Sequence, residues 1–278
     1  MEGNPPENRE KPILQRRLPH DPWGDPALAR LPGMKPVAPG EWLWVDEAYD
    51  RQMAERRRLI ATRPHDVLAS DEAARDAAEE LLGLVVGELA GKPGFMPEDG
   101  AMRCPDGQRV ALAHDTPHGA LATLGALVQE DFCILERRGN DAHVLTAAVL
   151  CFPASWTLSQ KFLRPLDAIH GPVVSYDSLM ARRVGHMLNM LRPGRPLWRA
   201  NALFYRDPAL FQPRSEAAPR CPEEREETDR VPYIRSERQT LLRLPGTGAI
   251  VFSIHTWLVM RESLTPAQRV AMEAGLRR

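Results

Sequence analysis

The spacing of apolar residues predicts helices in the first part of the chain. Apolar positions recur every three or four residues from about residue 47 to 61 and again from about 71 to 89. We expect Ser70 to cap the second helix and Gly91 to end it. The run of arginines in the first helix indicates one strongly solvated face. Residues 95–109 have neither period and predict a loop.

The spacing then changes to alternation, which predicts strands. The first two strands form a hairpin, and an amphipathic helix from about Ser178 separates them from the rest. Pro266 occupies the first position of a short C-terminal helix. Five antiparallel strands interrupted by a helical crossover predict an α+β fold. The predicted strands are residues 129–136, 143–151, 198–207, 234–244 and 248–259.

Alternation also assigns side chains to the two faces of a strand. In the strand at 234–244, Arg235 and Glu237 point to one face, whereas Ser236 and Arg238 point to the other. These polar residues therefore cannot all line one pocket.

The ends of the chain differ from its middle. Residues 1–40 contain nine prolines, which predict an extended N-terminal arm. Apolar residues between the prolines, such as Leu18 and Trp23, indicate that the later part of the arm lies across the domain surface. Residues 41–278 are expected to form a single domain, with a polar insertion near 212–229.

Composition excludes several classes of protein. The 36 basic and 37 acidic residues nearly cancel, so we expect neither nucleic acid nor an anionic membrane surface as a partner. The four cysteines form no CxxC pair, which argues against a zinc ribbon or an iron–sulfur cluster. The sequence has no run of about 18 apolar residues and no signal-peptide pattern, so a soluble, cytoplasmic protein is expected.

The segment 151–177 is where chemistry is expected. It is longer than most loops in compact domains, and such loops are usually functional or disordered. Its aromatic residues, Trp156 and Tyr176 among them, favour an ordered ligand-binding loop. Its one histidine, His170, precedes Gly171 and Pro172, which restrict the backbone. From spacing alone, this histidine either binds a ligand or merely shapes a turn.

Several separate segments, in this order and spacing, resemble one protein family. It is the family of the haem-binding subunit of haem-dependent oxidative N-demethylase, and the resemblance covers roughly residues 40–265. It implies a PAS-like antiparallel sheet with a helical crossover and terminal extensions, which holds haem b and oxidises a small secondary amine with O2. The matching segments are Gln129-Glu130-Asp131, residues 151–156, Lys161, residues 169–173, residues 199–201 and residues 235–241.

The resemblance also implies roles for individual residues. It implies that His170 is the axial ligand of the iron, while His255, beside Trp257 on a predicted strand, is the rival ligand or simply a strand residue. Haem propionates need cations, and Trp156 would flank the haem or pack in the core. The candidate cations, which ordinary cross-strand ion pairs explain equally well, are Arg199, Arg235, Arg238 and Lys161.

A secondary amine is protonated at neutral pH, so a carboxylate near the iron would bind the ammonium and accept its proton. The matching residues are Glu237, Glu130 and Asp131, each with a structural alternative. Two positions depart from the family pattern, because Val174 replaces a second proline and Ala202 replaces a tryptophan. The second departure would enlarge the pocket, change the substrate or mark a relative that binds haem without turnover.

These observations leave two main hypotheses open. The first is a haem-dependent monooxygenase subunit that demethylates a dimethylamine-like substrate. Because the chain has no G-x-G-x-x-G segment, its flavin, iron–sulfur and NADPH-linked components would be separate reductase subunits. The second is a non-catalytic haem-binding sensor or carrier, since fold does not fix function.

Overall fold

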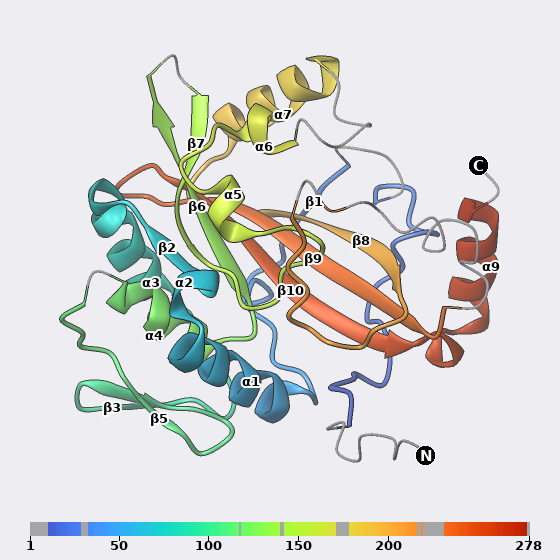
Figure 1. Cartoon of the computed structure of the whole chain (residues 1–278), viewed down its shortest axis with the longest axis horizontal. Coiled ribbons are helices and arrows are strands. Elements are labelled where there is room, and N and C mark those ends of the chain that lie inside the picture. Colours follow the sequence, from blue (N-terminus) through green and yellow to red (C-terminus); the bar gives the residue numbers. More distant parts are fainter. Residues whose placement is uncertain are drawn as a thin grey trace, which may run out of the picture.

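The fold is built on one large antiparallel sheet. The computed structural model describes residues 11–28, 33–116, 118–139, 142–170, 178–215, 218 and 231–276, with the side chain of His170 left out. Within these residues, seven strands pair in the order β1-β8-β9-β10-β6-β7-β2, and three short strands form a second sheet in the order β3-β4-β5 (Figure 1). All the pairings are antiparallel, as predicted.

The strands of the large sheet differ greatly in length. They are β1 (Lys35–Pro36), β2 (Leu68–Ser70), β6 (Asp131–Arg138), β7 (Ala142–Val149), β8 (Leu197–Tyr205), β9 (Tyr233–Arg243) and β10 (Ile250–Met260). The small sheet contains β3 (Met96–Glu98), β4 (Ala101–Arg103) and β5 (Arg109–Ala111). The five long strands are the five that alternation predicts, and β1 and β2 are added at the two edges.

Helices precede the sheet, interrupt it and follow it. They are α1 (Tyr49–Thr62), α2 (Pro64–Val67), α3 (Arg75–Leu89), α4 (Gly119–Leu127), α5 (Leu158–Lys161), α6 (Leu166–His170), α7 (Ser178–Met190) and α9 (Pro266–Leu276), with short 3-10 turns η1 (Glu72–Ala74) and η3 (Arg261–Ser263). The predicted helices at 47–61 and 71–89, the crossover helix and the C-terminal helix are therefore confirmed, and the fold is mixed α and β.

Three local predictions are wrong. The cap before α3 is Asp71 and not Ser70, because the Asp71 carboxylate accepts from the Ala73 amide at the start of η1. The arginine run of α1 is not one solvated face, since Arg56 is fully buried. Residues 95–109 are not a loop but contribute to the small sheet. Its strands have three residues each, too few for a visible period.

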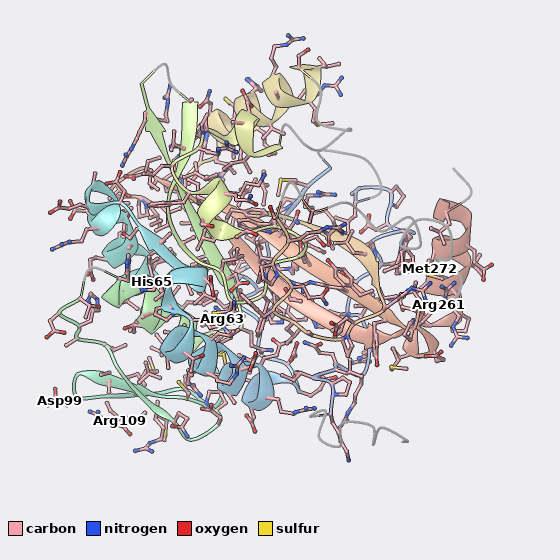
Figure 2. The ribbon with its side chains drawn as sticks, viewed as in Figure 1. Arg63, His65, Asp99, Arg109, Arg261 and Met272 are labelled. Carbon is pink, nitrogen blue, oxygen red and sulfur yellow. The ribbon has the colours of Figure 1, made fainter. Side chains whose placement is uncertain are left out.

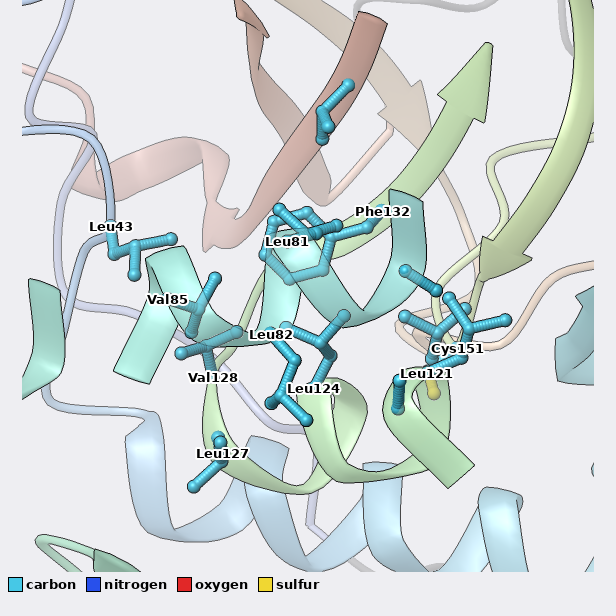
Figure 3. Close-up of a cluster of buried hydrophobic side chains, with 14 of the residues drawn as sticks. Leu43, Leu81, Leu82, Val85, Leu121, Leu124, Leu127, Val128, Phe132 and Cys151 are labelled. Carbon is cyan, nitrogen blue, oxygen red and sulfur yellow. The ribbon is translucent and has the colours of Figure 1, made fainter. Parts of the chain in front are cut away.

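The two faces of the large sheet carry separate cores. We call the α1 face the one to which Ser236, Arg238, His255 and Trp257 point, and the α7 face the one to which Glu237 and its alternate neighbours point. Helices α1, α3 and α4 bury the largest apolar cluster against one end of the α1 face, and Figure 3 shows its leucine-rich centre. Helices α5, α6 and α7 pack a second cluster against the α7 face.

The N-terminal arm and α9 cover the other end of the α1 face. Leu18 of the arm and Met272 of α9 are buried in one cluster with Trp257, so the arm lies across the domain as its apolar residues predict. Figure 2 shows Met272 on the side of the molecule opposite Asp99 and Arg109 of the small sheet. None of the helices in the described part of the chain combines the length and hydropathy that crossing a membrane requires.

One side chain of the arm extends the sheet. Strand β6 pairs with β10 only as far as Ile254. Beyond that point Gln15 bonds to the main chain of β10. Its backbone N–H donates to the Leu258 carbonyl (2.9 Å), and its Oε1 accepts from the Leu258 amide (2.8 Å). Its Nε2 donates to the Thr256 carbonyl (3.2 Å). Gln52 of α1 donates to the same Thr256 carbonyl (3.1 Å). The Thr256 carbonyl and the main-chain N–H and carbonyl of Leu258 thereby have hydrogen-bond partners.

Candidate functional site

The segment 151–177 is largely helical where the structure describes it. Short helices α5 and α6 follow one another, and α6 ends at His170. The backbone of His170 is therefore placed at the last residue of a helix that packs on the α7 face through Ile169. The His170 side chain and residues 171–177, with Tyr176 and Asp177, lie outside the described residues, so iron ligation by His170 stays a prediction.

Lys161 connects these two helices. Its side chain is 6% exposed, and its Nζ donates to the Ile169 carbonyl at 2.7 Å. That carbonyl belongs to the last turn of α6, where the helix dipole favours a cation. Lys161 therefore fixes the end of the helix that carries His170.

Glu237 lies on the α7 face of β9 and is held from three sides. Its Oε2 accepts from Asn201 Nδ2 (3.2 Å) and from Gln239 Nε2 (3.1 Å). Its Oε1 faces Arg235 Nε at 3.7 Å. Asn201 Oδ1 also accepts from the Glu237 amide (3.0 Å), so the side chains from β8 and β9 set the orientation of this carboxylate.

Arg235 is buried and has a structural role in this arrangement. Its guanidinium is 0% exposed and donates to the Leu210 carbonyl (2.9 Å) and to the Phe152 carbonyl, and it lies over the Tyr205 ring. It thus ties the start of the 151–177 segment to β9 and contributes a positive charge behind Glu237.

Arg199 has weaker partners. Its Nη1 donates to Gln239 Oε1 at 3.4 Å, and its Nε is buried with no hydrogen-bond acceptor among the described residues. Burial lowers the pKa of this guanidinium, and the nearby Glu237 charge opposes that effect. A buried donor without an acceptor is costly, so a ligand carboxylate would fit here.

The α7 face is incompletely covered around these residues. Strands β9 and β10 lie in the middle of the sheet, yet Gln239 and Phe252 on this face are only half-buried, as are Arg199 and Asn201 on β8. Trp156 from the 151–177 segment and Phe252 are half-buried against the same apolar cluster. Apolar and charged groups therefore border one incompletely covered part of the sheet.

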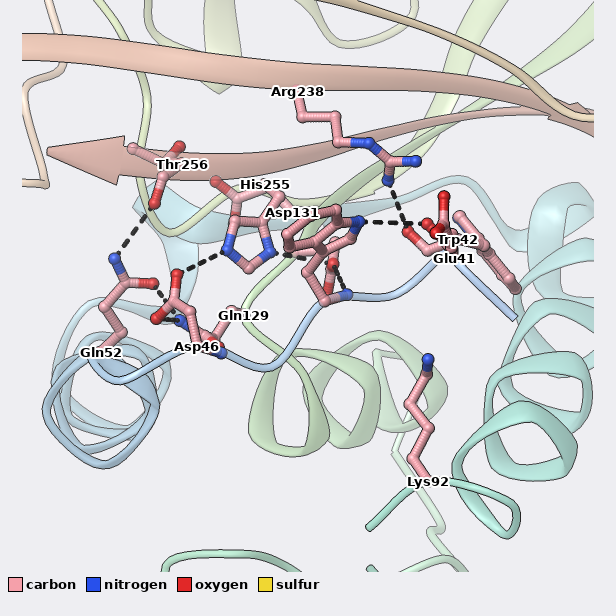
Figure 4. A network of polar contacts seen from close by, with 12 residues as sticks. Glu41, Trp42, Asp46, Gln52, Lys92, Gln129, Asp131, Arg238, His255 and Thr256 are labelled. Atoms are coloured by element: carbon pink, nitrogen blue, oxygen red, sulfur yellow. Dashed lines mark hydrogen bonds and ion pairs between the residues drawn. The ribbon is translucent and has the colours of Figure 1, made fainter. Parts of the chain in front are cut away.

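The α1 face is different, because His255 is 1% exposed there and both its ring nitrogens meet carboxylates. Nδ1 lies 3.0 Å from Glu130 Oε1, and Nε2 lies 3.1 Å from Asp46 Oδ2 (Figure 4). Burial alone would lower the pKa of His255, but the two carboxylates outweigh it and raise that pKa to about 9. An imidazolium has no lone pair for a metal, so the geometry argues against His255 as the iron ligand.

Arg238 belongs to the same buried network. It donates to the Trp42 carbonyl (2.9 Å) and lies between the rings of Trp198 and Trp44, at 4.9 and 5.5 Å from their centroids. Burial lowers its pKa, and the charge of Glu130 opposes this. Because Arg238 and Glu237 point to opposite faces, the prediction that they cannot share a pocket is confirmed.

The two remaining acidic candidates have structural partners. Glu130 Oε1 also accepts from the Trp44 amide (2.8 Å), which holds the segment before α1 against the sheet. Asp131 forms a buried ion pair with Arg56 (2.7 Å) and accepts from the amides of Cys151 (2.7 Å) and Phe152 (2.9 Å). Asp131 therefore fixes the point where the 151–177 segment leaves the sheet.

The structure thus divides the predicted site residues into two groups. Glu237, Arg235 and Arg199 come together on the α7 face, with Lys161 and Trp156 on the segment packed against that face. Arg238 and Glu130 lie on the α1 face. Among the described side chains, no three or more His, Cys, Asp or Glu residues are grouped to hold a metal ion.

A comparison with known families identifies the family of the chain. The family model described as "Haem-dependent oxidative N-demethylase, alpha subunit-like" matches residues 33–274. The chain belongs to this family. The resemblance carried by the separate sequence segments is thereby confirmed, and the family is haem-dependent.

The α7 face fits what a haem-dependent oxidative N-demethylase subunit must hold. Haem has an apolar ring and two carboxylates, and the half-buried Phe252 and Trp156 offer apolar surface near the buried Arg199 Nε that lacks an acceptor. On the α1 face, by contrast, the cations Arg238 and His255 pair with protein acceptors, and the charged atom left without a partner among the described residues is an acceptor, Glu130 Oε2, which cannot bind a propionate.

The predictions from sequence did not single out some residues that the structure places beside the predicted ones, on the α7 face and on the α1 face. Asn201 and Gln239 share strand faces with Arg199 and Glu237, so alternation already contained the signal for them. Phe252 has the same kind of signal in β10. No local sequence pattern indicated Asp46, because 209 residues separate it from His255.

Proposed function

We propose that this chain is the haem-binding subunit of an oxidative N-demethylase that acts on a small secondary amine with O2. Haem b would be held against the α7 face, by strands β8, β9 and β10 and the segment that contains α5 and α6. His170 would supply the ligand to the iron. The order of the five long strands along the sheet is β8-β9-β10-β6-β7, with the first and last long strands of the chain adjacent, which supports a PAS-like description.

One observation carries this proposal: part of the α7 face is incompletely covered by protein, and the family is haem-dependent. Arg199, Asn201, Gln239 and Phe252 are half-buried on a sheet whose other face is closed. Arg199 has a buried donor with no acceptor among the described residues, which a propionate would satisfy.

Several residues of this face would each bind or position a different part of the cofactor. Arg199 would bind a propionate, Trp156 and Phe252 would offer apolar surface to the ring, and Lys161 holds the last turn of α6, the helix that ends at His170. Arg235 keeps the start of the 151–177 segment in place. When bound, haem supplies the activation of O2 and the oxidation of the methyl group.

Glu237 binds the substrate amine. A secondary amine arrives protonated, and the carboxylate of Glu237 accepts a hydrogen bond from its ammonium N–H at Oε1. Asn201 and Gln239 occupy Oε2, so Oε1, which lies 3.7 Å from Arg235 Nε, is the atom left to accept from the substrate. Methyl oxidation releases formaldehyde, and electrons come from a separate reductase subunit. Glu130 and Asp131 serve the fold instead.

Haem reconstitution followed by absorption spectroscopy tests the proposal. We expect a Soret band that persists in His65→Ala, a control at an exposed histidine of α2, and that is lost or strongly shifted in His170→Ala. Glu237→Gln should keep the Soret band but lose most formaldehyde release from dimethylamine. No Soret band in the wild type would refute haem binding. A stable oxy form without formaldehyde release would identify a sensor or carrier.

A further inference from the structure

The outer face of α7 carries an unusual set of side chains. From Ser178 to Pro196 the sequence has four arginines and no aspartate, glutamate or lysine, although the whole chain is nearly neutral. Leu179 and Met190 on this helix are 46% and 57% exposed. We call this set, which continues from α7 into the turn that follows it, the α7 surface: Leu179, Arg182, Arg183, Met190, Arg192 and Arg195.

The arginines of the α7 surface have no partners in the part of the chain that the structure describes. All four are exposed, and none of their guanidinium groups makes a hydrogen bond or ion pair with any residue that the structure describes. On α1, by contrast, Arg58 pairs with Glu55 at 2.6 Å, and Arg57 pairs with Asp106. Arg57 and Arg58 of α1 therefore have acidic partners nearby, whereas the arginines of the α7 surface have none among the described residues.

The position of α7 links this surface to the proposed haem site. The inner face of α7 packs through Val184, Met187 and Leu188 into the cluster that contains Phe252 and Trp156. Arg243 of β9 donates to the Leu188 and Leu191 carbonyls (2.9 Å each) and so fixes the C-terminal end of the helix on the sheet. A single helix, about 10 Å across, therefore separates the α7 surface from that cluster.

We propose that the α7 surface is the docking site for a small acidic electron-transfer protein or domain that carries a flavin or an iron–sulfur cluster. The inference rests on the proposed function, which needs electrons from another polypeptide. Unpaired arginines complement an acidic partner and accelerate its association. Arginine and methionine are enriched in interfaces, whereas lysine and glutamate are depleted, and the α7 surface follows that composition.

Charge reversal tests the proposal with a matched control. Arg182→Glu with Arg183→Glu reverses two adjacent exposed arginines of α7. Arg16→Glu with Arg17→Glu reverses two adjacent exposed arginines of the N-terminal arm, which packs on the α1 face, and changes the net charge equally. The probes are an acidic [2Fe–2S] ferredoxin and an acidic flavodoxin, and the haem-reconstituted full chain is titrated with each by calorimetry at low and high ionic strength.

We expect the wild type to bind at least one probe, with affinity that falls as salt rises. The α7 variant should lose at least tenfold in affinity and the arm variant less than twofold. Equal losses in both variants, or no binding of either probe, would overturn the proposal. Tighter binding of a random-sequence DNA duplex than of either probe would overturn it as well. The Soret band of each variant separates failure of the docking proposal from failure of the proposed function. If haem still binds but docking does not depend on the α7 surface, only the docking proposal is overturned.

Discussion

The two faces of β9 and β10 place neighbouring residues in different surroundings. On the α1 face, the charged Arg238 and His255 are almost completely buried, and Nη1 of Arg238 and both ring nitrogens of His255 meet protein acceptors at 2.9–3.1 Å. On the α7 face, Arg199 is half-buried, and its one side-chain hydrogen bond to a described residue is at 3.4 Å. Both faces are rich in charge, so charge alone does not mark a site. The distinguishing feature of the α7 face is a half-buried cation whose Nε has no acceptor among the described residues.

The largest effect is expected from removing the central charge of the α1 face. His255→Leu leaves Glu130 and Asp46 as buried carboxylates without their cation, so we expect the free energy of unfolding to fall by about 3–5 kcal/mol. The matched variant Gln239→Leu, on the adjacent strand but on the α7 face, should cost less than about 1 kcal/mol because Gln239 is half-buried and neutral. Urea unfolding measures the free energy of unfolding of both variants. Similar decreases in the two would show that the two faces do not differ.

A smaller effect is expected from pH. The pKa of His255 is about 9 in the folded protein and has its ordinary value of 6.5 in the unfolded chain. Because the folded pKa is raised, this stabilisation is fully present below pH 6.5 and is lost as the pH rises through 9. We expect the free energy of unfolding to fall by on the order of 2–3 kcal/mol across this window.

The His255→Gln variant controls for other groups that titrate in the same range. Its unfolding free energy should depend less steeply on pH between 6.5 and 9 than that of the wild type, as measured by urea unfolding in a series of buffers. Parallel curves for the two proteins would show that His255 is not charged in the folded state.

The smallest effect on stability is expected from removing the Arg199 charge, which should have the clearest effect on haem affinity. In Arg199→Leu, haem affinity should fall about tenfold or more, since a charge-assisted hydrogen bond contributes about 1.5–3 kcal/mol, while unfolding changes by less than about 1 kcal/mol. Arg238→Leu should show the opposite pattern, with lower stability and haem affinity within threefold of the wild type. Haem titration and urea unfolding of both variants separate the two faces, and the reverse assignment would move the haem to the α1 face.

Much of this fold follows from sequence because its main elements are long. The alternation in β9 and β10 fixed which side chains share a face, and that separated Glu237 from Arg238 before any contact was known. The small sheet escaped prediction since its strands are three residues long and turn at Gly100 and Gly107, both with positive φ.

The charged network of the α1 face was not predictable in the same way. Arg56 lies in a run of three arginines that predicts solvation, yet its guanidinium donates to the Gly125, Gln129 and Glu130 carbonyls in addition to Asp131. These acceptors lie 69 to 75 residues away in the chain. Only tertiary packing brings them together, and no local pattern records it.

The way Gln15 completes the edge of β10 has a practical consequence for handling this protein. A side-chain amide and one backbone N–H occupy the positions that a neighbouring strand would otherwise take. Shortening the chain past residue 15 would uncover three consecutive apolar residues of β10, Trp257 to Val259, beside vacant main-chain groups, a template onto which other molecules can add as strands. Affinity tags and fusions therefore belong before this glutamine, and preparations that lose it to proteolysis should precipitate.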